Sequence, residues 1–103
     1  MTRAFITKAV EDILVESFKD QLSYGPAEYA YGNSKMFRRE AEAVLDAAKR
    51  ANAAGQLTHS HLLLCATFDA LASEDLGDLR HKLVGVGSLV VDWLEQLDRQ
   101  AGR

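Results

Sequence analysis

The chain has 103 residues, of which 48% are hydrophobic and 26% are charged, and its net charge is -3. This length predicts one domain over residues 1–103, and the composition is that of a globular protein. The 15 Asp and Glu exceed the 12 Lys and Arg, so the chain lacks the basic field that a nucleic-acid partner would require. No stretch resembles a signal peptide or a membrane span, so we expect a cytoplasmic protein with no membrane partner.

The N-terminal half predicts two amphipathic helices separated by a loop. The first covers about residues 2–22, with Val10 and Phe18 on its apolar face and the charged residues mostly away from that face. The second begins at residue 33 or 34, either of which can cap it. It ends before Gly55, which suits a left-handed helix exit.

The C-terminal half predicts two more helices, which begin after the capping residues Thr58 and Asp75. The third ends near residue 73 and is apolar nearly all the way round, so it must be surrounded. The fourth ends near residue 100, and Gly85 and Gly87 within it favour close backbone packing. Its apolar residues are spaced alternately four and three residues apart, a spacing typical of helices that pack nearly antiparallel to one another. They are Leu79, Leu83, Val86, Val90, Trp93 and Leu97.

We therefore expect an all-α fold that resembles a four-helix bundle and is completed by oligomerisation. A chain of this length has few other helices with which to cover the apolar surface of its third helix, so the simplest explanation is assembly into a homodimer or tetramer. The oligomer interface predicted on the third and fourth helices comprises Leu63, Phe68, Val86, Val90 and Trp93.

Two surfaces are candidates for binding. Tyr24, Tyr29 and Tyr31 all fall within the loop predicted over residues 23–34, where they either form a stacking surface for a ligand or anchor the loop onto the helices. Arg38 and Arg39 lie on the outward face predicted for the second helix.

The sequence predicts no catalytic residue and only a weak metal set. His61, Cys65 and Asp69 share one face of the third helix, but one straight helix rarely supplies more than two ligands and the usual zinc spacings are missing. Clustered carboxylates are the remaining route to magnesium, and Asp69 and Glu40 are the candidates on inner helix faces. We expect no cofactor unless these two residues hold magnesium.

Residues 58–99, THSHLLLCATFDALASEDLGDLRHKLVGVGSLVVDWLEQLDR, resemble the C-terminal part of short MazG-like proteins, which are common in phage genomes. Trp93, Asp98 and Arg99 carry much of the likeness, and residues 13–25 are similar to a segment near the N-terminus of these proteins. The resemblance implies an oligomeric helical bundle that uses magnesium to cleave a nucleoside triphosphate to its monophosphate and pyrophosphate.

The acidic motifs that the resemblance implies are mostly missing here. The first motif falls on Ala66 and Asp69, and the second falls near Lys82 and Gly85, so three of four expected ligands are absent. We therefore expect a catalytically impaired MazG-like protein that acts by protein–protein binding, as a phage-encoded modulator of a host protein would. The alternatives are a magnesium-dependent pyrophosphohydrolase with an altered metal site and a purely structural oligomerisation module.

Overall fold

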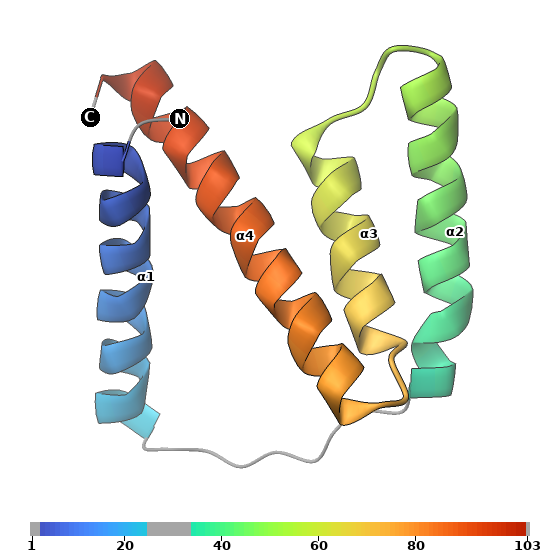
Figure 1. Cartoon of the computed structure of the whole chain (residues 1–103), viewed down its shortest axis with the longest axis horizontal. Coiled ribbons are helices and arrows are strands. Elements are labelled where there is room, and N and C mark those ends of the chain that lie inside the picture. Colours follow the sequence, from blue (N-terminus) through green and yellow to red (C-terminus); the bar gives the residue numbers. More distant parts are fainter. Residues whose placement is uncertain (1–2, 25–33, 103) are drawn as a thin grey trace. The chain divides into compact units, whose positions relative to one another are not determined.

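The computed structural model describes residues 3–24 and 34–102, with side chains at residues 7–20 and 35–102. Within these ranges the chain forms four helices and no strand, which confirms the all-α class (Figure 1). The helices are α1 (Arg3–Tyr24), α2 (Ser34–Ala53), α3 (His59–Leu71) and α4 (Leu76–Ala101). None of these described helices is long and apolar enough to cross a membrane.

The turn between α2 and α3 follows the capping chemistry predicted for it. Gly55 has a φ of +70°, and the amide of Gln56 donates to the carbonyl of Ala51 at 2.7 Å, as in a Schellman motif. Thr58 caps α3, because its side chain accepts from the His61 amide at 3.3 Å while the His61 ring accepts from the Thr58 amide at 3.0 Å. The two helices are therefore fixed at the end where they meet.

The start of α4 is also capped as predicted. Asp75 precedes the helix, and its Oδ2 accepts a hydrogen bond from the backbone amide of Asp78 at 2.8 Å. Asp78 places a negative charge in the first helical turn, where it interacts favourably with the helix dipole.

The described chain divides into two compact units. One holds α1 and Val91–Arg103, and the other comprises Gly32–Val90 with α2, α3 and the first part of α4. The helical content is compatible with the expected bundle, while the single domain over residues 1–103 stays a prediction.

In the unit Gly32–Val90, α2 and α3 pack side by side as a hairpin (Figure 1). Ala48 and Ala70 are buried, and such small side chains let two helix backbones approach closely. The rings of Phe37 and Phe68 lie 6.3 Å apart at 45°. The thiol of Cys65 donates to the Val44 carbonyl at 3.3 Å, so both apolar and polar contacts join the hairpin.

In the unit formed by α1 and Val91–Arg103, the apolar face predicted for α1 is partly wrong. Asp12 and Glu16 were expected to lie away from that face, yet they line a hollow of about 460 Å³ together with Leu94. Val10 and Phe18 are exposed instead. Ile13 and Ser17 line the hollow and Ala9 is buried, so these residues form the side of α1 that faces its unit. Asp12 and Glu16 lie beside them, with side chains that are 61% and 70% exposed.

The described side chains bury little apolar volume, because the buried apolar residues among them are Ala9, Ala48 and Ala70. Close backbone packing at Gly85 and Gly87 is not found within the described chain, since nothing lies within 4 Å of a Cβ built at either position. Large apolar side chains on each of the described helices remain exposed.

Candidate functional site: the groove between α2 and α3

A groove of about 610 Å³ lies between α2 and α3, and we call it the α2–α3 groove. Its volume lies within the range of binding pockets in proteins. Small or apolar side chains form most of its lining, and three charged side chains join them. The lining residues are Arg38, Ala41, Glu42, Leu45, Leu62, Cys65, Ala66, Asp69 and Ala72.

The groove is positioned by the hairpin packing described above. Successive turns of α2 supply Arg38, Glu42 and Leu45, while α3 supplies Leu62 and Asp69 from the facing side. Leu45 and Leu62 are 48% and 40% exposed, so they leave a large part of their apolar surface uncovered. The groove is thus an open apolar channel rather than a closed cavity.

An ion pair fixes the rim near the start of α2. The guanidinium of Arg38 contacts the carboxylate of Glu74, which lies in the turn between α3 and α4. Both side chains are exposed, so this pair contributes little to stability but does restrict where Arg38 points.

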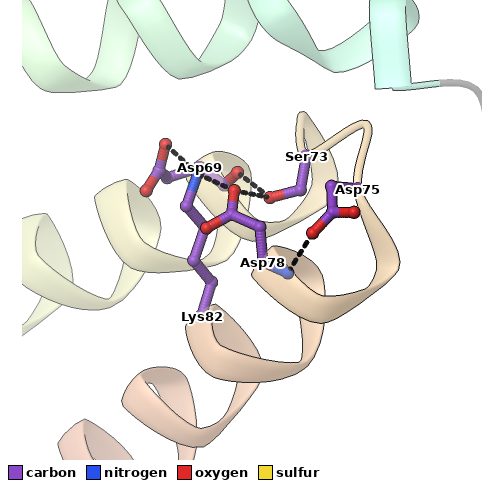
Figure 2. A network of polar contacts seen from close by, with 5 residues as sticks. All are labelled: Asp69, Ser73, Asp75, Asp78 and Lys82. Carbon is purple, nitrogen blue, oxygen red and sulfur yellow. Dashed lines mark hydrogen bonds and ion pairs between the residues drawn. The ribbon is translucent and has the colours of Figure 1, made fainter.

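A polar network joins the end of α3 to the start of α4 (Figure 2). The ammonium of Lys82 lies 3.3 Å from Oδ1 of Asp69 and 3.1 Å from Oδ2 of Asp78. The hydroxyl of Ser73 is 3.3 Å from the backbone carbonyl of Asp69 and 3.4 Å from the Asp78 carboxylate. The cation that balances both carboxylates is therefore a side chain of the protein itself.

The chemistry of two groups at this site follows from their surroundings. The hydrogen bond to Asp78 raises the pKa of Lys82, and the pair with Asp69 adds to the rise, although partial burial opposes both. Lys82 therefore stays charged at neutral pH. Burial raises the pKa of the Cys65 thiol, and the negative charge of Asp69 raises it further, so Cys65 is a poor nucleophile at neutral pH.

The residues around Asp69 do not fit the magnesium centre that the resemblance implies. A magnesium centre for a triphosphate needs several carboxylates, whereas Asp69 is paired with the Lys82 ammonium. Glu40 is exposed on α2 rather than on the inner face predicted for it, and it does not line the groove. Among the residues described, no group of three or more His, Cys, Asp or Glu is arranged to hold a metal ion.

The predicted binding residues fall into two groups. The tyrosine surface lies outside the described residues, since the structure describes neither Tyr29 nor Tyr31 and no side chain for Tyr24. Arg38 lines the α2–α3 groove, and Arg39 is exposed on the same helix. Whether Arg38 or Arg39 contacts a partner stays a prediction.

The predicted oligomer interface is only partly free for contact. Leu63, Phe68, Val86, Val90 and Trp93 are each half-buried in the structure. Phe68 already stacks against Phe37 within the hairpin, so part of its surface serves the fold. The role of these five residues in assembly stays a prediction.

The sequence interpretation missed two buried acids on α4. Glu95 and Asp98 are only 2% and 6% exposed in the unit that contains α1. The Nε of Arg99 lies 2.8 Å from Oε1 of Glu95 and supplies the opposite charge, although Oε1 receives no well-aligned hydrogen bond. Val91, Glu95 and Asp98 are spaced four and three residues apart, as residues on one buried helix face are. Only apolar residues enter the sequence prediction at this spacing, so it does not identify this face.

Comparison of the chain with protein-family models, curated proteins and solved structures finds no match. The candidate site therefore rests on its own geometry.

Proposed function

We propose that this chain is a MazG-like helical protein with an impaired catalytic site, and that it acts by binding a protein helix in the α2–α3 groove. The observation that carries the proposal is the groove itself, with its apolar lining and its partly exposed Leu45 and Leu62. An amphipathic helix that lays its apolar face into such a groove is a recurring mode of recognition.

The Lys82 network supports binding over hydrolysis. In the alignment that the resemblance suggests, Lys82 stands where an acidic ligand is expected, and its ammonium lies 3.3 Å from Asp69. A fixed positive charge at that distance repels a divalent cation and neutralises the one aligned carboxylate that remains. The alternative, a pyrophosphohydrolase with an altered metal site, would have to displace Lys82 from Asp69 first.

A nucleotide panel separates these two functions. The purified chain is titrated with magnesium or manganese plus each nucleoside triphosphate, while heat and pyrophosphate are measured. We expect neither metal-dependent binding nor pyrophosphate release. Turnover that Asp69→Asn abolishes would replace the binding proposal with the hydrolase.

A restored variant provides the positive control for this panel. Ala66→Glu, Lys82→Glu and Gly85→Asp together rebuild both acidic motifs, and a side chain at Gly85 meets open space. We expect manganese binding in the restored variant and none in the wild type. Equal metal binding by both chains would show that the metal ligands lie elsewhere.

A matched pair of substitutions tests binding at the groove. Leu45 and Leu64 are both 48% exposed, but only Leu45 lines the groove. We expect Leu45→Glu to abolish retention of helical protein partners on the immobilised chain, whereas Leu64→Glu leaves it unchanged. Equal effects of the two variants would contradict a groove-specific function.

A further inference from the structure

The residue that closes the capping box of α3 is a histidine. A capping box usually pairs a Ser or Thr cap with a Glu or Gln three residues later, and that side chain is an acceptor at neutral pH. Here Thr58 is the cap and His61 is the third residue after it. Nδ1 of His61 lies 3.0 Å from the backbone nitrogen of Thr58 and 2.8 Å from its hydroxyl oxygen. A side chain that gains a proton between about pH 5 and 8 therefore occupies the position of one that does not.

The hydrogen bonds fix which nitrogen of the His61 ring carries its proton. A backbone amide can only donate, so Nδ1 accepts the bond from the Thr58 amide with its lone pair. The proton of the ring then lies on Nε2, and the ring is neutral. The Thr58 hydroxyl oxygen accepts from the His61 amide at 3.3 Å, which completes the other half of the box. The closed box is thus a property of neutral His61.

Protonation of Nδ1 reverses the polarity of this contact. The ring then presents an N–H toward the Thr58 amide, so two donors face each other where one hydrogen bond had been. The protonated ring can still donate to the Thr58 hydroxyl, but the Thr58 amide loses its acceptor. A positive charge in the first turn is also unfavourable, because the helix dipole is positive at that end. Acid therefore opposes the closed box through two separate effects.

The described surroundings of His61 offer no carboxylate to balance a protonated ring. The first turn of α3 contains no acidic residue, and the polar contacts of the ring within the described chain are those with Thr58. The last turns of α2, which packs against α3, bring more positive than negative charge, and their one acid is already paired with Arg50. The titratable and charged groups on these two elements near His61 are His59, Cys65, Asp46, Lys49 and Arg50.

We propose that His61 is a proton-sensitive cap, which closes the start of α3 when its ring is neutral and releases the first turn when the ring is protonated. This switch is built into the hairpin and goes beyond the proposed function. Leu62 follows His61 directly and lines the α2–α3 groove, so the switch acts on one end of that groove. Any effect on partner retention rests on the proposed function, whereas the switch itself is measured on the chain alone.

Hydrogen exchange at the start of α3 measures the release directly. The amide of Leu62 donates to the Thr58 carbonyl at 3.3 Å, so its protection reports whether the first turn is closed. Protection is expressed relative to the intrinsic exchange rate at each pH. Between about pH 8 and about pH 5, where histidine gains its proton, we expect the protection of the Leu62 amide to fall about fivefold, the factor for the loss of one capping contact.

His61→Gln is the decisive variant. Glutamine is a side chain that a capping box uses and it does not titrate, so it closes the box at both pH values. In this variant the protection of the Leu62 amide should not depend on pH. His59→Gln is the matched control, because it removes a titrating ring from the same turn and leaves His61 in place, so it should retain the fivefold loss.

Two results of hydrogen exchange overturn the proposal. One is wild-type protection that is the same at both pH values, and the other is a loss of equal size in His61→Gln, which would place the proton-sensitive group elsewhere in the chain. The nitrogen chemical shifts of the His61 ring give a second measurement on the wild type, which requires no variant to fold. At about pH 8 they should show the proton on Nε2, and a proton on Nδ1 would contradict the closed box.

The switch and the proposed function fail separately. Retention of helical partners is compared between wild type and Leu45→Glu at about pH 8, where the cap is closed. Failure of the switch therefore leaves that comparison unchanged, and failure of partner retention leaves the exchange measurement unchanged.

Discussion

Replacing Lys82 by Gln removes the positive charge that Asp69 and Asp78 share while keeping most of the side-chain stem. The ammonium contacts the two carboxylates at 3.3 and 3.1 Å, and the lysine side chain is 28% exposed. Each partly exposed ion pair contributes about 0.2–1 kcal/mol. With both pairs lost and the two acids left to repel each other, we expect Lys82→Gln to lower the free energy of unfolding by about 1–2 kcal/mol.

Urea unfolding at neutral pH and one fixed chain concentration measures this loss. Arg80→Gln is the matched control, because Arg80 is exposed on the same helix and has no charged partner among the described side chains. The Lys82→Gln effect should shrink in about 1 M salt, where the screening length falls to about 3 Å. A loss that persists in high salt would refute the electrostatic account and assign the effect to packing of the lysine stem.

The pH dependence has a definite sign. Because the folded-state pKa of Lys82 is raised, its contribution is complete below the unfolded-state value of about 10.4 and is lost as the pH rises through the folded-state value. The difference between wild type and Lys82→Gln should therefore be constant from neutral pH to about pH 9 and disappear in strong alkali. A difference that already fades between neutral pH and about pH 9 would contradict the raised pKa of Lys82.

The remaining predictions concern the hairpin and α4. Thr58→Ala should lower the free energy of unfolding by about 1 kcal/mol because it removes the α3 cap, whereas Thr58→Ser should be close to wild type in the same urea assay. Gly85→Ala should raise the melting temperature, since it gains up to about 1 kcal/mol of helix propensity in open space. Gly55→Ala should lower the melting temperature, because the left-handed φ of +70° costs about 1–2 kcal/mol for a residue with a Cβ; equal shifts for the two alanines would contradict this argument. Cys65 should react with iodoacetamide more slowly in the folded chain than in urea at pH 8, because its pKa is raised, and equal rates would show that the thiol is not shielded.

Local chemistry explains why the helix boundaries could be predicted. The caps at Thr58 and Asp75 and the exit at Gly55 depend on neighbouring residues alone, and all three occur where the sequence indicated. Whether a segment is helical depends on residues close together in the sequence, so periodicity and helix propensity were enough to predict the all-α class.

Helix orientation could not be predicted in the same way. The face that a helix buries depends on its partner, and α1 lines its hollow with Asp12 and Glu16 while exposing Phe18. The burial of Glu95 likewise breaks the rule that charged side chains point outward, because Arg99 supplies a counter-charge one turn away.

The candidate site was predictable only in part. The pairing of Lys82 with Asp69 follows from charge and from the approach of α4 to α3, and the resemblance had already placed Lys82 where an acidic ligand is expected. The groove required the register of α2 against α3. A one-dimensional pattern does not contain that register, since Leu45 and Leu62 stand on different helices.

The unit that contains α1 combines two segments that lie far apart in the sequence, and this has a consequence for synthesis on the ribosome. The α2–α3 hairpin uses contacts close in sequence and can form as soon as residue 71 has emerged. The unit that holds α1 is completed only by Val91–Arg103, which are made after the hairpin. The side of α1 that carries the buried Ala9 therefore stays uncovered until those residues have been made, and nascent chains with such exposed surface depend most on chaperones.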